Sequence, residues 1–423
     1  MALSKLKMKK PKVDARDAVL ALDIGTEYVK ALIAQVEGDE LQIIGVGRKH
    51  QTLGDMHSGA IADIDGVVKN CEVALADAEE QAGFQAKNVI VGIAGELVKG
   101  TTSTIRYRRP QPDLPLSERE MEFIIEKVQD RARMKAQRQV AVETSNPEVE
   151  VKLVNSALVS IHIDGYKVSN PIGFQGKDVA VQIYTAFAPM VHIGAIERVT
   201  NELSLELIAV AAEPFAVARS VIGTDVSSNF TAILADIGGG TTDIAVIDDG
   251  GVEGTKMFGI GGRSFTHQIA NELNLTYENA EKLKVNLGKG NMKPEVEARV
   301  DEALKRTLDV WMSGVELALD EFKTVDHLPS RILMCGGGAS LKQITEALTQ
   351  TNWYESLPFT KRPHVQLIQP SEVIGVVDKT DSEHKLDHTF ITAMGLLRVG
   401  YDTISTVDTG DSIKDKLSKI LRI

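Results

Sequence analysis

Two short glycine-containing turns, far apart in the chain, constrain the fold more than any other feature of the sequence. The first is Leu22-Asp23-Ile24-Gly25-Thr26, and the second is Ala235-Asp236-Ile237-Gly238-Gly239-Gly240-Thr241-Thr242-Asp243. Each turn follows an apolar strand and precedes another. Glycines let the backbone approach a phosphate and aim N–H groups at it, and threonine hydroxyls add donors. Asp23 and Asp236 each lie at a strand end, where a carboxylate can hold Mg²⁺, often through water.

Two such turns predict a duplicated fold with a nucleotide bound between the copies. The residues expected at its phosphates are Gly25, Thr26, Gly238, Gly239, Gly240 and Thr241. One Asp-x-Gly turn alone would be weak evidence, since such turns are common in β-hairpins. The alternative is a coincidental pair of structural hairpins.

A third glycine turn, Gly336-Gly337-Gly338-Ala339-Ser340, follows an apolar strand over 331–335 and opens a helix. A helix N-terminus behind glycines favours an anion and lets a flat ring pack on the backbone. Alone, this turn could be an ordinary strand-to-helix connection. With the two hairpins, it predicts that Gly336, Gly337, Gly338 and Ser340 contact the adenosine and the α-phosphate.

Short apolar strands alternate with helices along the chain, which predicts an α/β fold. The 423 residues exceed one compact core, and the net charge of -12 argues against nucleic-acid binding. Cys71 and Cys335 are the only cysteines, so a disulfide framework is excluded and a reducing cytoplasm fits. The longest apolar stretch, 179–196, contains polar residues and a proline, and it predicts strands rather than a membrane span.

The pattern changes between residues 88 and 177, which predicts a β-rich inserted subdomain. A proline-rich connection leads to a helix that begins with a capping box of Ser117 and Glu120. Further along, Asp164-Gly165 between two strand-like runs predicts a hairpin turn.

The three glycine turns, in this order, resemble those of the actin, Hsp70 and sugar-kinase superfamily. The resemblance implies an actin-like duplicated ATPase fold with ATP and Mg²⁺ as cofactors. Residues 212–216 look like its first connecting helix, in which Glu213 would orient the attacking water while Asp236 holds magnesium. Glu281 and Lys284 resemble its ribose-binding Glu-x-x-Lys pair, and 393–395 fit the second connecting helix. Taken alone, that pair is also an ordinary i,i+3 helix pair, and Glu213 before a proline could merely begin a helix.

Within the superfamily, the chain resembles FtsA, the bacterial cell-division actin homologue, over nearly its whole length. The segments 59–64, 170–177 and 261–270 carry this likeness. It implies an ATP-binding protein, at most a slow ATPase, that polymerises with itself and ties the tail of FtsZ to the membrane. The expected location is the inner face of the cell membrane at the division site. Two features depart from the family: the stretch 143–154 looks longer, and Glu27 places an acid in the first phosphate turn, where we expect it to point outward.

The resemblance also implies the domain limits. Subdomain 1A would take residues 1–87, 178–228 and 371–400, the inserted SHS2-type subdomain 1C 88–177, subdomain 2A 229–260 and 326–370, and subdomain 2B 261–325. A linker over 401–411 would precede a membrane-targeting helix over 412–423.

On that last helix, four aliphatic residues fall within one stripe of roughly 100°. They are Ile413, Leu417, Ile420 and Leu421. Lysines flank the stripe, as in helices that lie in a membrane interface. The alternative is a helix that docks on the protein itself.

Two other functions stay open. PilM, a cytoplasmic protein of type IV pilus machinery, shares the expected fold and insert, although the amphipathic tail favours FtsA. A small-molecule kinase of the superfamily would need a phosphoryl acceptor and a catalytic base, and no segment indicates either.

Overall fold

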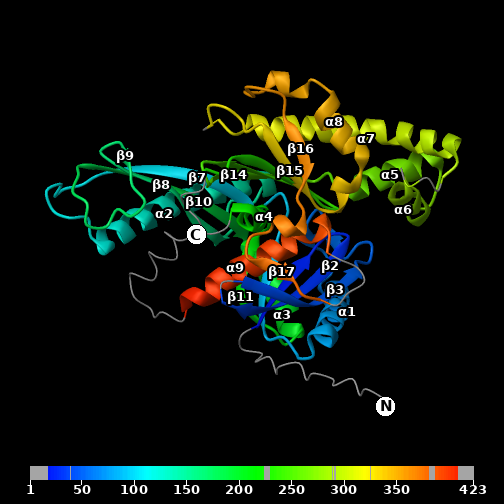
Figure 1. Ribbon diagram of the computed structural model, residues 1–423, viewed down its shortest axis with the longest axis horizontal. Helices are drawn as coiled ribbons and strands as arrows, with labels where there is room; N and C mark the ends of the chain where they lie inside the picture. Colours follow the sequence, from blue (N-terminus) through cyan, green and yellow to red (C-terminus); the bar gives the residue numbers. More distant parts are fainter. Residues whose placement is uncertain are drawn as a thin grey trace, which may run out of the picture.

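The computed structural model describes residues 18–38, 40–222, 229–287, 289, 292–323, 325–380 and 386–407. Two sheets form its framework, and five strands follow the same order in each. The first sheet runs β11-β6-β1-β2-β3-β17, and the second begins β16-β15-β12-β13-β14. In both, an antiparallel three-stranded meander adjoins two parallel strands. This repetition is the duplication predicted from the paired turns, within an α/β fold (Figure 1).

The first sheet consists of β1 (Ala18–Ile24), β2 (Tyr28–Glu37), β3 (Glu40–His50), β6 (Asn88–Ile93), β11 (Glu206–Ala212) and β17 (Val376–Asp378). All seven residues of β1 are buried, as expected for a central strand. Helix α1 (Ile64–Ala82) packs on β3, where Gly45 and Gly47 leave no space for side chains beneath its carbonyls. Its N-terminus is capped by Asp63, and it ends at Gly83 in the left-handed region (φ 82°). Helix α3 (Met190–Glu202) and a small hairpin of β4 (Met56–His57) and β5 (Ala60–Ile61) complete this half.

The second half contains β12 (Ala232–Ile237), β13 (Thr242–Asp248), β14 (Gly251–Phe258), β15 (Arg331–Cys335) and β16 (His364–Leu367). Its helices are α5 (Gly262–Leu273), α6 (Tyr277–Asn286), α7 (Pro294–Asp320) and α8 (Lys342–Gln350). Short 3₁₀ segments are η2 (Gly337–Ser340), η3 (Trp353–Ser356), η4 (Pro370–Glu372) and η5 (His388–Phe390). A separate hydrophobic core, with Trp311 fully buried, lies between this sheet and its helices.

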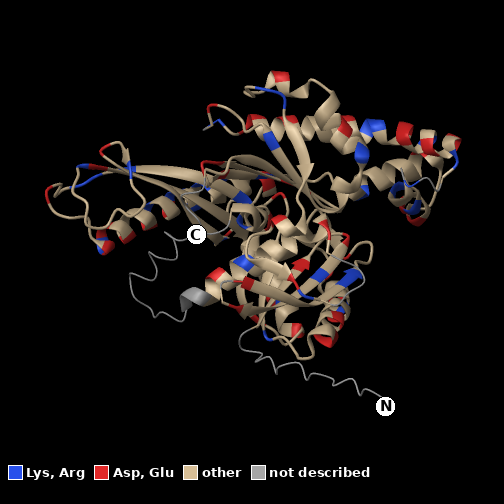
Figure 2. Cartoon of the chain, viewed as in Figure 1, with Lys and Arg blue, Asp and Glu red and all other residues tan. Residues whose placement is uncertain are grey.

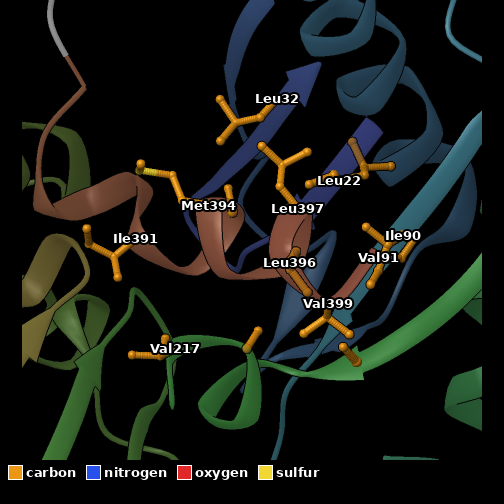
Figure 3. Packing of buried hydrophobic residues seen from close by; sticks show 14 of the residues in the cluster. Leu22, Leu32, Ile90, Val91, Val217, Ile391, Met394, Leu396, Leu397 and Val399 are labelled. Atoms are coloured by element: carbon orange, nitrogen blue, oxygen red, sulfur yellow. The ribbon is translucent and has the colours of Figure 1, made fainter. Parts of the chain in front are cut away.

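Two helices each follow one half in the chain and pack against the other half. Helix α4 (Glu213–Ile222) follows the first sheet but packs mainly on the second, while α9 (Ile391–Val407) returns to the first. Figure 3 shows α9 packed against that sheet, with Leu396 and Leu397 among apolar residues of β1, β2, β6 and α4. The two helices touch at Gly395, where a Cβ would lie 2.2 Å from the carbonyl oxygen of Ala216. The segments that sequence assigned to the connecting helices therefore lie against each other between the halves.

The insert extends the second sheet. Its elements are β7 (Lys99–Arg108), α2 (Glu118–Thr144), β8 (Val151–Ile163), β9 (Tyr166–Lys167) and β10 (Asp178–Pro189). Strand β7 pairs with β14 at Gly254 and Thr101, which joins all nine strands into one sheet. The strand pairing places both ends of the insert differently from the expected limits of 88 and 177. Strand β6 (88–93) lies in the first sheet, and β10 (178–189) pairs along its length with β7 and β8 of the insert. The hairpin at Asp164-Gly165 is confirmed, with φ of 49° and 88°.

Charged residues lie mainly on the outer helices and turns, with both signs along α7 and α2 (Figure 2). Within the described part of the chain, no helix has the length and apolarity needed to cross a bilayer.

Candidate functional site

A cavity of about 650 Å³ lies between the two halves. Its wall includes the β1–β2 turn, the β12–β13 turn, η2, α6 and the start of α4. Every residue predicted at the nucleotide lines this cavity except Gly240: Asp23, Gly25, Thr26, Glu213, Asp236, Gly238, Gly239, Thr241, Glu281, Lys284, Gly336, Gly337, Gly338 and Ser340. The fold therefore brings together segments that are more than a hundred residues apart.

The two hairpin turns meet at one end of the cavity. A Cβ on Gly240 would lie 2.6 Å from Oγ1 of Thr26, and one on Gly239 would lie 2.7 Å from Cβ of Glu27. Gly240 thus packs against the opposite turn instead of facing the cavity. Glycine is required here for close approach between the halves, a constraint that sequence alone could not separate from phosphate binding.

Four carboxylates converge behind the turns. Glu213 begins α4, Asp23 ends β1, and Asp236 and Asp243 lie on β12 and β13. Burial, and then the charges of Asp23, Asp243 and Asp236, raise the pKa of Glu213 well above its usual range. Burial and the neighbouring Asp236 do the same to the pKa of Asp243. The pKa of Asp236 is also raised, first by burial, although the Thr392 hydroxyl donates to its Oδ2. Burial and mutual repulsion therefore outweigh the positive charge that reaches Glu213, Asp236 and Asp243.

Two cations missed in the sequence also line the cavity. Lys30 Nζ lies 2.8 Å from Oδ2 of Asp23; burial acts to lower the pKa of Lys30, but the Asp23 charge leaves it raised. Arg48 pairs with Lys30 across β2 and β3, and its guanidinium lies 3.8 Å from the ring centroid of Tyr28. The signal for Lys30 was present in the sequence, since alternation along β2 directs it to one face with Tyr28.

The third glycine turn forms the opposite wall. Gly336 adopts a left-handed φ of 82°, and a Cβ there would lie 2.1 Å from Oδ1 of Asp236. Gly338 is similarly close to Ile237, with 2.5 Å to its Cγ2. Gly337 differs, because nothing lies within 4 Å of its Cβ position and it is exposed to the cavity. Ser340 Oγ and His388 Nε2 are 2.9 Å apart.

Helix α6 closes the remaining side. Lys284 Nζ lies 2.7 Å from Oε2 of Glu281, and it donates to Gly262 O at 2.9 Å and to Thr266 Oγ1 at 2.7 Å. The predicted pair is thus fastened to the start of α5. Apolar wall residues nearby in the chain, Val285, Leu287 and Leu341, suit a flat ring.

Glu27 does not point outward, contrary to our expectation. Its side chain is 15% exposed, lines the cavity and accepts a hydrogen bond of 2.7 Å from Nε of Arg263. Its other oxygen lies 2.7 Å from Nε2 of His50. The guanidinium of Arg263 neutralises the acid, so repulsion of a phosphate does not force it away.

Among the described residues, no group of three or more His, Cys, Asp or Glu is arranged to hold a metal ion directly. The surroundings nevertheless fit a cation that arrives with phosphates. Asp243 Oδ1 is buried without a hydrogen-bond partner, and the pKa values of Asp243 and of its neighbours Glu213 and Asp236 are all raised. Asp23 and Asp236 line the same space. The four residues assigned to the membrane helix, Ile413, Leu417, Ile420 and Leu421, lie outside the described residues.

Comparison with known proteins gives concordant results. The family model "Cell division protein FtsA" matches residues 233–395. Cell division protein FtsA of Enterococcus faecalis is 26% identical over 401 residues, covering 87% of this chain and 84% of that protein. FtsA of Pseudomonas aeruginosa is 26% identical over 361 residues, covering 79% and 81%. A solved structure of the PilM-PilN type IV pilus biogenesis complex superposes with a TM-score of 0.64 at 18% identity, covering 90% of this chain and 98% of that chain, and so shares the fold. The resemblance expected from the sequence is thereby confirmed: the chain is similar to cell division protein FtsA of several bacteria, and its fold is an actin-like α/β fold.

Proposed function

We propose that this protein is an FtsA-type cell-division protein that binds Mg-ATP between its halves, polymerises, and connects an FtsZ ring to the membrane. The observation that carries the nucleotide part is the cavity where equivalent turns of two repeated sheets face each other. The relatives named cell division protein FtsA support the cellular role.

The phosphates would lie at the two turns. Gly25, Gly238 and Gly239 line the cavity without side chains, so a phosphate can approach the backbone of both turns, and Lys30 supplies a positive charge beside Asp23. Mg²⁺ would be held by Asp23 and Asp236, partly through water, and would supply charge neutralisation for the phosphates. Adenosine would lie over Gly337, with Glu281 and Lys284 at the ribose.

Hydrolysis would be slow. Glu213 is buried among other acids, so its raised pKa keeps it protonated at pH values where a free glutamate has lost its proton. A protonated Glu213 can orient a water by hydrogen bonding but is a poor base. Catalysis would then rest on positioning and electrostatics, as in most phosphoryl transfer.

Assembly would use the insert and the C-terminal segment. The insert projects away from the nucleotide cavity, and none of its residues between 99 and 189 lines it. Apolar side chains are exposed on its loops and on β9, including Leu114 (54%), Phe174 (49%) and Tyr166 (78%). Such residues suit subunit contact. Residues 412–423 would attach the filament to the membrane.

The test has two parts. Calorimetry should detect Mg-ATP binding, and sedimentation with anionic vesicles should depend on ATP and should recruit FtsZ. Absence of ATP binding would remove the nucleotide assignment. Recruitment of a pilus-protein peptide without FtsZ would favour the PilM-type role, and a phosphorylated small molecule would indicate a kinase.

A further inference from the structure

We propose that Arg263 is a positioning residue that fastens the two phosphate turns to each other and so sets how long a nucleotide stays bound. The proposal rests on the proposed nucleotide site and concerns a residue that no phosphate motif includes. Arg263 is the second residue of α5, in the second half.

The backbone at Arg263 is hydrogen-bonded to the β12–β13 turn. Its N–H donates to Gly239 O at 2.8 Å, and the N–H of Gly262 donates to Gly238 O at 2.9 Å. Gly261 has no space for a Cβ, which would lie 2.7 Å from the same Gly238 oxygen. A shift of the β12–β13 turn therefore has to move the first turn of α5 with it.

The side chain of Arg263 is held by the first half. Nε donates to Glu27 Oε2 at 2.7 Å, Nη2 donates to Thr26 O at 2.5 Å, and Nη1 donates to Met56 O at 3.3 Å. The two charged side chains are only 12% and 15% exposed, so solvent screens the pair weakly. A planar guanidinium can make all three contacts, whereas a lysine ammonium offers a single point of charge.

Both Glu27 and Arg263 line the cavity, so the pair lies where a ligand between the turns would be enclosed. The turns touch directly as well, through Gly239 and Gly240 against Glu27 and Thr26. Separation of the turns would open this end of the cavity. It would break charge-assisted hydrogen bonds, which are stronger than neutral ones. The Arg263 contacts therefore oppose opening at this end and slow dissociation of the nucleotide.

The experiment compares Arg263→Met, Arg263→Lys, Glu27→Gln and the double variant Glu27→Gln/Arg263→Met. The dissociation rate of a fluorescent ATP analogue with Mg²⁺ is measured by stopped flow. Arg263→Met should dissociate roughly tenfold faster than the parent, because it loses hydrogen bonds to charged and carbonyl groups. Arg263→Lys should fall between, and the double variant should be no faster than Arg263→Met, since both changes break one contact. Lys256→Met is the control, because Lys256 pairs with Glu321 inside the second half, away from the cavity.

Hydrogen exchange of the nucleotide-free proteins gives a second measurement. Residues 24–28 and 238–243 should exchange faster in Arg263→Met and Glu27→Gln, and at the parental rate in Lys256→Met. Folded variants with parental dissociation and parental exchange would overturn the proposal, and so would additive effects in the double variant. If the parent binds no nucleotide, the proposed function fails, and the exchange measurement alone then decides the role of Arg263.

Discussion

At the scale of single residues, acids in the cavity wall are paired with cations from other strands or from the other half, as Asp23 is with Lys30 and Glu27 with Arg263. Asp-x-Gly-Thr turns are local patterns, so Asp23, Gly238 and Thr241 could be read directly. Lys30 was overlooked although strand alternation indicates its face, whereas Arg48 and Arg263 could not be assigned, because each acquires its neighbours only through strand pairing or contact between the halves. The same limit explains the error at Glu27, whose partner Arg263 is 236 positions away.

The open position of Gly337 offers a direct test of the adenosine assignment. A tryptophan there meets no protein atom at its Cβ and projects into the cavity, so Gly337→Trp should fold normally. We expect Mg-ATP affinity to fall by roughly a hundredfold or more, about 2.7 kcal/mol. Calorimetry would measure this. Gly194→Trp is the matched control, since Gly194 on α3 is equally open but lies outside the cavity. Unchanged affinity in Gly337→Trp would refute the assignment.

Asp243 should make the ligand-free protein sensitive to pH. Burial raises the pKa of Asp243 well above its usual range. Between the usual and the raised pKa, the folded protein therefore keeps a proton that the unfolded chain has lost. Stability therefore falls as pH rises from the usual carboxyl range toward the raised pKa. Asp243→Asn keeps an acceptor for Thr241 and should raise the melting temperature at neutral pH by about 2 °C or more while flattening this dependence. Thermal melts across pH would show it. Asp77→Asn, at an exposed site on α1, should change neither, and a lower melting temperature for Asp243→Asn would contradict the account.

Glu213 can be tested with an isosteric change. Glu213→Gln preserves the buried shape but alters the hydrogen bonding available to a water. We expect ATP turnover to fall by roughly tenfold to a hundredfold, with Mg-ATP affinity nearly unchanged. Phosphate release under saturating ATP measures the first and calorimetry the second. Glu206→Gln, on the exposed start of β11, is the control. Equal turnover in Glu213→Gln and the parent would remove Glu213 from the mechanism.

At the scale of helices and strands, the sequence indicated the helix cap and the strands correctly, but it did not indicate which residues or strands they would contact. The predicted cap at Ser117 is present, since its Oγ accepts from the Glu120 N–H at 3.2 Å. The Glu120 carboxylate does not return to the cap but accepts two hydrogen bonds from buried Arg109, at 2.8 and 3.0 Å. Similarly, the apolar runs of β6 and β10 were recognised as strands, but only pairing shows which sheet each joins. Hydrophobic alternation reports burial and carries no information on the neighbouring strand.

The insert should support filaments without contributing to ATP binding. Leu114→Ser combined with Phe174→Ser removes two exposed apolar side chains from its loops. We expect filaments in electron micrographs to be lost, while Mg-ATP affinity stays within about twofold of the parent, a change below roughly 0.5 kcal/mol. Val142→Ser is the control, because Val142 is also exposed but lies at the other end of α2, beside the Lys99–Glu143 ion pair. Filaments that persist in the double variant would rule out this surface.

At the scale of the whole molecule, duplication was predictable because it repeats a short motif. The family resemblance implied two connecting helices, at 212–216 and 393–395, and the structure shows that they touch at Gly395 against Ala216. The pairing of the insert with the second sheet was not predictable, since it rests on one pair of residues from distant segments, Thr101 and Gly254.

Membrane attachment should require both the tail and assembly. If residues 412–423 form the predicted helix, burial of its four aliphatic side chains would offset little more than the cost of ordering it, so one copy should bind weakly. A filament that presents many copies gains avidity. Truncation before Ser412, or Leu417→Glu, should abolish co-sedimentation with anionic vesicles and leave Mg-ATP binding intact. Ser412→Ala is the control. Parental co-sedimentation of either disabled variant would show that the anchor lies elsewhere.

Because β7 pairs with β14, the insert is joined to the first half by the chain and to the second half by the shared sheet. By chain, the insert leaves the first half after β6 and returns to it at α3. By hydrogen bonds, it is also joined to the second, through Thr101 and Gly254, Thr102 Oγ1 donating to Val252 O, and Tyr184 OH beside Thr255 Oγ1. The first half holds it as well, since the buried Ala212 N–H donates to Asn155 Oδ1. If the halves rotate about α4 and α9, the insert has to move relative to at least one of them. A small rotation of the halves near the nucleotide would then become a larger displacement at the far end of the insert, where it would change the contact with a neighbouring subunit.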